Sequence, residues 1–537
     1  MAILCSTLGD DDIVRGSFVQ REQRSINLKM SRRGFAKLQN IPSEVCLLSQ
    51  MSSEWFDQTS TSLNACSLET FVPILDSDDD GKVSAFLLPL VIGCYQLEEK
   101  TCIPASTTTD DDADSTDDAS SLVGQSSSRL GELRLYMIPS PASSTLLSSS
   151  QHAENSNAAI GNGNNNETFR FRDSVCIVNM ESGVLDGKWR RRRRRCNTQR
   201  ISTENGSNYY ETMPIYASAC ASGKIHLHSL EKKRNDSSST LLHLASSEVE
   251  EQYEVSPLCL SLAWNDFITY DGDDSRNEQC HDQIVSSYSN GTLTLHTIHP
   301  TNSNSSVGCC HIEETHRWKG HDMFGCPAEV WTCSFLRGNA NVVLSGADDC
   351  KLKLWDIRNT QRETYTIGAT EFDAGVSAIS PHPGRDHIFA VGSYDENLRI
   401  YDHRKLDQPM MKVGVGGGIW RIKWHLSCWD DNNEQQSSSE RNHEKKERLL
   451  IAAMHGGCRV IDIPGLDNYD CEYGGSSSVD DIEVLSEFTA HQSMAYGVDW
   501  VCFGGSGHDA AASCSFYDQK AFLWNPNKLT NIMHVND

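Results

Sequence analysis

The residues Ser345–Arg358, which read S-G-A-D-D-C-K-L-K-L-W-D-I-R, decide the fold. Asp349 lies six positions before Trp355, and the apolar Leu352 and Leu354 alternate with polar residues between them. An apolar residue at every second position indicates a half-buried strand, and the acidic residue in front of it indicates the tight turn that leads into that strand. The stretch therefore predicts a turn followed by a strand.

The same pattern recurs along the chain. The clear copies start at Asp395 and Asp518 and end six positions later at Tyr401 and Trp524, and weaker copies start at Asn290, Ser222 and His455. Repetition at roughly 40 to 60 residues is typical of WD-repeat propellers. We therefore predict an all-β fold, a seven-bladed WD-repeat β-propeller with disordered polar insertions.

Length and composition limit the alternatives. The 537 residues accommodate seven blades of about 40–45 residues together with long insertions. No apolar run approaches the ~18 residues that a membrane span needs, so we expect no membrane partner. Twenty cysteines without a C-x-x-C pair favour reduced thiols and a cytoplasmic location, although a nuclear one is also compatible. The net charge of −26 argues against a nucleic-acid partner.

The chain divides into three parts. We expect a disordered N-terminal segment at 1–40, the propeller at 41–527 and a C-terminal tail at 528–537. The apolar run Val45–Leu48 is predicted to complete the last blade and so to close the ring. Low-complexity insertions are expected at about 107–128, 141–168, 190–210, 430–447 and 470–480.

The run Arg190–Arg195 has more than one interpretation. Six arginines can form a nuclear-import signal or contact an anionic surface. In a chain this acidic we favour a solvated loop tip.

Two segments imitate metal sites. Asp76, Asp78 and Asp80 resemble the start of a calcium-binding loop, but Leu87 stands where that loop needs a bidentate Glu. The segment Cys309–His316 lacks a second pair of ligands at a suitable spacing. We therefore predict no metal and no cofactor.

Some polar residues are expected to be scaffold. In WD repeats a His, a Ser or Thr, the turn Asp and the Trp form a hydrogen-bonded chain. This predicts a structural role for His321, Ser345, Asp349 and Trp355 in blade four. The same role is predicted in blade seven for His491, Asp518 and Trp524.

The sequence lacks the G-x-S-x-G, H-E-x-x-H and P-loop motifs. Blade six, however, has His455 where the clear repeats have Asp, and an imidazole can act as a general base near neutral pH. The alternative is that His455 only hydrogen-bonds its turn.

Four aromatic residues are expected on the same side of the ring, on turns and at the starts of inner strands. Such a rim suits a quaternary ammonium ligand, but core packing is the alternative. The four are Trp331, Trp420, Tyr394 and Tyr517.

Several phrases then resemble one family. They are G-G-G-I-W-R-I-K-W-H (Gly416–His425), A-A-M-H-G-G (Ala452–Gly457), Y-G-V-D-W (Tyr496–Trp500) and C-S-F-Y-D-Q-K-A-F-L-W (Cys514–Trp524). The chain resembles the diphthine methyl esterase family, the WD-repeat proteins of diphthamide biosynthesis, over roughly residues 60–525. Leu426 departs from the family pattern, where a Pro is usual, and so does Cys458, where a bulkier residue is usual.

The resemblance implies hydrolysis of the methyl ester on the diphthine intermediate of translation elongation factor 2, which would be the protein partner. On this hypothesis His455 activates water, and Arg421 or backbone N–H groups hold the oxyanion. The four aromatic residues bind the substrate's trimethylammonium group. Glu329, beside Trp331, either orients His455 or attracts the cation.

The competing interpretation is a non-enzymatic adaptor. W-D-I-R at Trp355–Arg358 matches the WDxR motif of substrate receptors of cullin-RING ubiquitin ligases. An esterase requires His455 and the aromatic group to be exposed together, whereas an adaptor requires only Arg358 to be exposed on the opposite side. In either case we expect a monomer.

Overall fold

The computed structural model describes residues 55–71, 87–97, 129–139, 169–171, 176–191, 214–232, 239–249, 256–266, 282–301, 310–425, 447–463, 466, 482–502 and 509–527. These residues belong to one compact unit, Trp55–Asp537. Every named element in this part of the chain is a β-strand. No helix among the described residues is long and apolar enough to cross a membrane.

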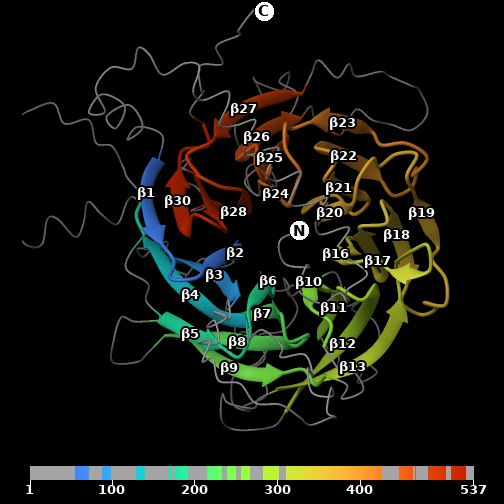
Figure 1. Cartoon of the computed structure of the whole chain (residues 1–537), viewed down its shortest axis with the longest axis horizontal. Helices are drawn as coiled ribbons and strands as arrows, with labels where there is room; N and C mark the ends of the chain where they lie inside the picture. The colour runs from blue at the N-terminus through green and yellow to red at the C-terminus, as the bar shows by residue number, and fades with distance from the viewer. Residues whose placement is uncertain are drawn as a thin grey trace, which may run out of the picture. The chain divides into compact units, whose positions relative to one another are not determined.

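Seven four-stranded antiparallel sheets stand around a common centre, which confirms the predicted all-β, seven-bladed propeller (Figure 1). Blade 1 comprises β2 (Asn64–Thr70), β3 (Leu87–Leu97), β4 (Arg129–Pro139) and β5 (Cys176–Met180). Blade 2 comprises β6 (Val184–Trp189), β7 (Ile215–Cys220), β8 (Ile225–Lys232) and β9 (Ser239–Ser246). Blade 3 comprises β10 (Cys259–Trp264), β11 (Asp282–Tyr288), β12 (Thr292–Pro300) and β13 (Cys310–Lys319).

The remaining blades follow in chain order. Blade 4 comprises β16 (Val330–Leu336), β17 (Asn339–Ala347), β18 (Leu352–Asp356) and β19 (Tyr365–Ile367), preceded by the short hairpin β14 (Asp322–Met323) and β15 (Cys326–Pro327). Blade 5 comprises β20 (Val376–Pro381), β21 (Ile388–Ser393), β22 (Asn397–Asp402) and β23 (Met411–Gly414). Blade 6 comprises β24 (Arg421–Trp424), β25 (Glu447–Ala452), β26 (Cys458–Ile463) and β27 (Glu483–Phe488). Blade 7 comprises β28 (Ala495–Cys502), β29 (Asp509–Ser515), β30 (Lys520–Trp524) and β1 (Trp55–Ser60).

The ring is closed by the strand β1, which pairs antiparallel with β30 and places Thr59 opposite Ala521. The edge of blade 7 is therefore occupied by Trp55–Ser60, and the prediction that Val45–Leu48 closes the ring was wrong; that run lies outside the described residues. Both segments precede the first blade, and only the pairing along the edge of β30 identifies the one that closes the ring.

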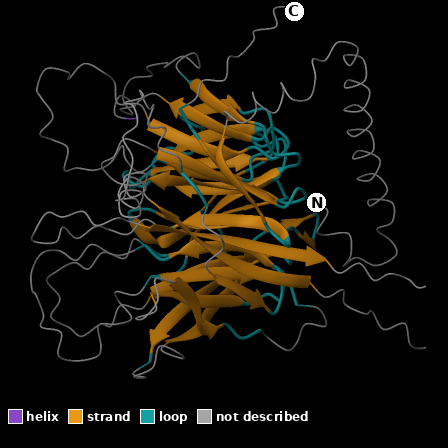
Figure 2. Ribbon diagram, turned by 90° about the vertical axis from the view of Figure 1, so that its left-hand side faces the viewer, coloured by secondary structure: helices purple, strands orange, loops and turns teal. Residues whose placement is uncertain are grey.

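The ring has two faces, seen edge-on in Figure 2. The first strand of each blade begins at one face of the ring, and the turn between its second and third strands lies at the same face. We call this face the front face. In blade 6, for example, the backbone N–H of Trp420 donates to the carbonyl of Ala452 at the end of β25. Met454 in the following turn forms a bridge with Ala495, where β28 begins. The first strands end at the opposite end, the back face.

The predicted scaffold network of blade 4 is present. His321 lies with Nε2 2.8 Å from Ser345 Oγ and Nδ1 3.0 Å from the Asp349 carboxylate. The indole N–H of Trp355 donates to the same Ser345 hydroxyl at 2.8 Å. Because all four side chains are buried and satisfied by one another, this network fixes the turn and has a structural role.

Blade 7 repeats most of this network. His491 contacts Asp518 at 3.3 Å and Ser513 at 2.9 Å, as the structural interpretation predicts. The Trp524 indole N–H, by contrast, has no acceptor among the described residues. The network is therefore complete in blade 4, whereas in blade 7 it lacks the hydrogen bond from the Trp indole.

Arg190 contradicts the prediction that the arginine run is wholly a solvated loop tip. It is buried at the end of β6, and its guanidinium lies 2.6 Å from Asp282 of blade 3. The ion pair links two blades, so this first arginine is part of the ring.

Candidate functional site

His455 lies on the front face in the turn between β25 and β26, and its side chain is 56% exposed. Its Nε2 atom lies 3.5 Å from an Oε1 atom of Glu396, which occupies the corresponding turn of blade 5. Glu396 and Met454, the residue before His455, have positive φ of 67° and 41°, so both turns are tightly wound. The imidazole is thus accessible and has a carboxylate partner.

Three of the four predicted aromatic residues lie in contact with one another at the front face. The ring centroids of Trp331, Tyr394 and Trp420 are separated by 5.6 Å to 6.4 Å. The fourth, Tyr517, joins them through two residues that the sequence reasoning did not select, Tyr496 and Phe516. Tyr496 lies 4.9 Å from Trp420, and Phe516 lies 5.7 Å from Tyr496 and 4.8 Å from Tyr517.

We call these six residues the aromatic arc: Trp331, Tyr394, Trp420, Tyr496, Phe516 and Tyr517. The two missed members stand within the phrases Y-G-V-D-W and S-F-Y-D, so their signal was the family phrases and not the repeat spacing. Most of the arc is packed, with Trp331 only 5% exposed, whereas Tyr517 is 45% exposed. The arc is therefore packed in the core at its Trp331 end and accessible to a ligand at its Tyr517 end.

One polar atom of the arc is left unsatisfied. The indole N–H of Trp420 is buried and has no acceptor among the described residues. Burying an unpaired donor is unfavourable, and the indole N–H groups of Trp318 and Trp524 are unpaired in the same way.

The arc borders the His455 turn. A Cβ atom added to Gly418 would lie 3.1 Å from the sulfur of Met454 and 3.3 Å from the ring of Tyr394. The lack of a side chain at Gly418 therefore lets the residue preceding His455 approach the arc closely.

A pair of carboxyl groups lies beside the arc. Glu329 precedes β16 and Asp348 follows β17, and the indole N–H of Trp331 donates to Asp348 at 2.6 Å. Burial, followed by the nearby charge of Asp348, raises the pKa of Glu329 to about 8. Burial also raises the pKa of Asp348. Ionising both carboxyl groups would place two negative charges side by side, which is unfavourable. The pair therefore retains a proton near neutral pH.

Glu329 and His455 have different partners. The carboxyl partner of Glu329 is Asp348, and the carboxylate beside His455 is that of Glu396. Glu396, and not Glu329, is therefore the carboxylate that pairs with the His455 imidazole. The sequence offered no signal for Glu396, since an acidic turn residue is ordinary in a WD repeat.

Arg421 extends into the channel. Its guanidinium lies 2.8 Å from Asp186 on the opposite side of the ring and 6.0 Å from the Trp420 ring centroid. A charged network continues behind it, in which Lys423 contacts Glu69 and Asp499. Because Asp186 already neutralises Arg421, this side chain is a weaker candidate for holding an oxyanion than the sequence suggested.

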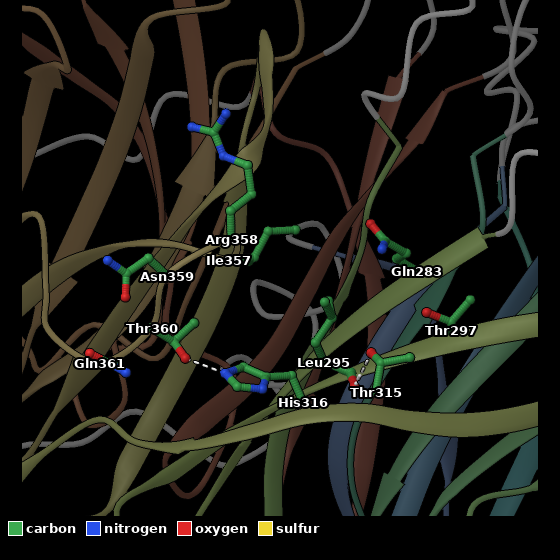
Figure 3. A pocket seen from close by; sticks show the side chains of 10 residues that line it. All are labelled: Gln283, Leu295, Thr297, Thr315, His316, Ile357, Arg358, Asn359, Thr360 and Gln361. Atoms are coloured by element: carbon green, nitrogen blue, oxygen red, sulfur yellow. Dashed lines mark hydrogen bonds between the residues drawn. The ribbon is translucent and has the colours of Figure 1, made fainter.

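A concavity lies at the back-face end of blades 3 and 4, with a volume of about 490 Å³ (Figure 3). It lies beside Arg358, whose side chain is 70% exposed and paired with Asp356 at 2.5 Å. His316 hydrogen-bonds Thr360 across it. Its other lining residues are Gln283, Leu295, Thr297, Thr315, Ile357, Asn359 and Gln361. The cavity is thus polar and distant from the aromatic arc, and the exposure that the adaptor interpretation requires of Arg358 is present.

Comparison with known proteins agrees with this architecture. The family model "WD domain, G-beta repeat" matches residues 312–356. A protein of Arabidopsis thaliana named E3 ubiquitin-protein ligase COP1 is 34% identical over 81 residues, only 15% of this chain and 11% of its own. This short match reflects the shared repeat.

Two further relatives match over much longer stretches. The diphthine methyltransferase homolog of Dictyostelium discoideum is 31% identical over 363 residues, which cover 65% of this chain and 78% of the relative. The human diphthine methyltransferase is 30% identical over 282 residues, so that the chain spans about half of that relative, 51%. Because the chain covers 78% of the Dictyostelium protein at 31% identity, it belongs to the diphthine methyltransferase family of WD-repeat proteins.

Proposed function

We propose that this protein hydrolyses the methyl ester of the diphthine intermediate on translation elongation factor 2, in the cytoplasm. Family membership supports diphthine as the substrate, and the phrases around Trp420 and His455 resemble the esterase of diphthamide biosynthesis. The observation that carries the proposal is the front face itself, where an exposed imidazole adjoins an aromatic arc and a carboxyl pair.

The arc and the carboxyl pair suit the cationic part of this substrate. Diphthine carries a trimethylammonium group, and aromatic faces attract such a cation with roughly 0.5–2 kcal/mol each. Glu329 and Asp348 add negative charge next to Trp331, and an arriving cation favours loss of the proton that the pair retains. Binding the cation therefore also lowers the free energy of ionising this buried pair.

His455 supplies the base. With Glu396 orienting its imidazole, it removes a proton from water as the water oxygen attacks the ester carbonyl. When the carbon–oxygen bond to the methoxy group breaks, the same imidazole returns the proton and methanol leaves. The product is a free carboxylate, which a later amidation step can use.

The negative charge that develops on the carbonyl oxygen needs donors. The unsatisfied indole N–H of Trp420 is the donor that we favour, together with front-face backbone N–H groups. Arg421 acts through its positive charge near Trp420 and not as the principal donor, because Asp186 already binds it.

The experiment is mass spectrometry of elongation factor 2 from cells lacking this protein, rescued with wild type, His455→Ala or His299→Ala. His299 is a matched control because it also pairs with an exposed Glu, Glu313 at 2.7 Å, on blade 3. We expect the methyl ester to accumulate in the deletion and in the His455→Ala rescue and to disappear with the other two proteins.

Normal, fully processed diphthamide in the deletion cells would refute the proposal. A second assay separates hydrolysis from methyl transfer, the reaction in the relatives' printed names. Purified protein incubated with methylated elongation factor 2 should release methanol without any methyl donor. A requirement for a donor, with incorporation of its methyl group, would favour transfer.

The adaptor function remains a second candidate because Arg358 is exposed beside a polar cavity. It predicts that Arg358→Ala weakens binding to a cullin-RING ligase component while leaving methanol release unchanged. Equal capture of that component by wild type and variant would argue against it.

A further inference from the structure

A His, a Cys and an Asp converge at the back face between blades 6 and 7. His425 follows β24, Cys502 ends β28 and Asp509 begins β29, directly opposite Cys502 in the sheet register. Their potential ligand atoms all lie within 4.8 Å of one another. β24 and β28 are neighbours around the ring in Figure 1, so this cluster spans the junction of two blades.

Two distances within the cluster can be compared with those around a tetrahedral metal ion. The Nε2 atom of His425 lies 3.6 Å from the sulfur of Cys502 and 2.9 Å from a carboxylate oxygen of Asp509. Around a tetrahedral zinc ion, bond lengths of about 2.3 Å to sulfur and 2.0–2.2 Å to nitrogen and oxygen place N and S about 3.6 Å apart and N and O about 3.4 Å apart. The N–S distance thus already matches, and the N–O distance would have to lengthen by about half an ångström.

A comparison within the molecule separates this cluster from a purely structural contact. Between blades 5 and 6, His382 contacts the carboxylate of Glu447 at 2.5 Å and packs edge-on against Trp424 at 4.5 Å. His425 likewise contacts Asp509 and packs edge-on against Trp500, at 4.4 Å.

The His–carboxylate–Trp contact is therefore a repeated device that joins neighbouring blades. Among the described residues, only its copy at blades 6 and 7 has a thiol within reach of the same imidazole nitrogen. The thiol is thus the feature in which the two copies differ.

We propose that His425, Cys502 and Asp509 bind one divalent zinc ion that clamps blade 6 to blade 7. Thiolate, imidazole and carboxylate are the three ligand types that zinc takes in proteins, and together they compensate its two positive charges. His425 is buried whereas the Asp509 side chain is 22% exposed, so water can reach the fourth position. The ion would lie at the opposite end of the first strands from the aromatic arc, and it has no role in the proposed hydrolysis.

The test uses the purified full-length chain, stripped with a chelator and dialysed. Titration with Co²⁺ should give the near-ultraviolet thiolate-to-metal absorption and saturate at one ion per chain, and zinc should abolish it by competition. Cys502→Ser should lose this absorption. Cys326→Ser, which changes an exposed thiol on β15, should keep it.

Zinc should also raise the melting temperature of the stripped wild type and of Cys326→Ser, but not that of Cys502→Ser. His382→Asn, which breaks the thiol-free copy, should lower the melting temperature and leave the metal stoichiometry at one. Saturation well below one ion per chain, or an absorption band that survives Cys502→Ser, would overturn the proposal. The methanol-release assay does not enter this test, so the two proposals can fail separately.

Discussion

The same turn is used in opposite ways in blades 4 and 6. In blade 4 its key residue is Asp349, whose side chain is 1% exposed and bound to the buried His321. In blade 6 the corresponding residue is His455, which is 56% exposed and pairs only loosely with Glu396 of the neighbouring blade. Both lie six positions before the residue that anchors the third strand, Trp355 or Ile461.

The difference indicates which turns of this scaffold can carry functional side chains. Asp349 is surrounded by donors from its own blade, and such a satisfied network stabilises a turn and leaves no atom for a ligand. Blade 6 has His455 in place of the Asp and forms no such network at its turn within the described part of the chain, so the side chain lies at the surface beside the aromatic arc. A turn that does not contribute a buried network is available for function.

The largest effect should follow from removing the exposed imidazole. His455→Ala should lower ester hydrolysis by about 10²–10⁴-fold, the usual contribution of a general base, measured as methanol release. Its melting temperature should match that of wild type, because the lost side chain is mostly exposed. Activity within a few-fold of wild type would show that blade 6 does not supply the base.

The next largest effect should be on stability and should follow from a change in the buried turn of blade 4. Asp349→Ala should lower the free energy of unfolding by about 2–4 kcal/mol, since it leaves His321 and a backbone N–H without their buried acceptor. Denaturant unfolding measures this loss, and Asp322→Ala, on the exposed β14, serves as the control. An unfolding loss equal to that of the control would contradict the assignment of blade 4 as scaffold.

A smaller effect, a stability that depends on pH, is expected for the carboxyl pair Glu329 and Asp348 and not for the two turns. The folded-state pKa of Glu329, about 8, exceeds its ordinary value of 4.5, so the folded protein binds more protons than the unfolded chain between these pH values. This pair therefore costs stability as pH rises through that window. Glu329→Gln should stabilise the protein by roughly 1–3 kcal/mol at pH 8 and by little at pH 4.

Thermal unfolding of wild type and Glu329→Gln across pH 4 to 8 measures the difference. The variant should also raise KM for the cationic substrate, because the pair can then carry only the one negative charge of Asp348 when the cation binds beside Trp331. A variant that is destabilised at pH 8 would mean that Glu329 is ionised and paired in the folded state.

The smallest effect is expected at the exposed end of the aromatic arc. Tyr517→Leu should raise KM about 2–5-fold, as expected for one exposed cation–π contact, whereas Tyr517→Phe should keep wild-type KM. Tyr365→Leu, an exposed tyrosine on β19 of blade 4, is the matched control. A KM raised equally by the two leucine variants would exclude a specific role for the arc.

The sequence by itself determined the ring and its scaffold network. Alternation within strands and the six-residue spacing from Asp to Trp are local patterns, and they predicted seven blades and the contacts of Ser345 with His321 and Trp355. The family phrases also led to the correct family, because they are continuous stretches of chain.

Only the tertiary structure decided the partners at the front and back faces. Arg421 and Asp186 are 235 positions apart, and His425 meets Asp509 only because blades 6 and 7 stand side by side. The closing strand Trp55–Ser60 was likewise decided by which segment pairs with the free edge of β30. Such contacts depend on how the blades are packed around the ring, and a local pattern of residues carries no information about a partner in another blade.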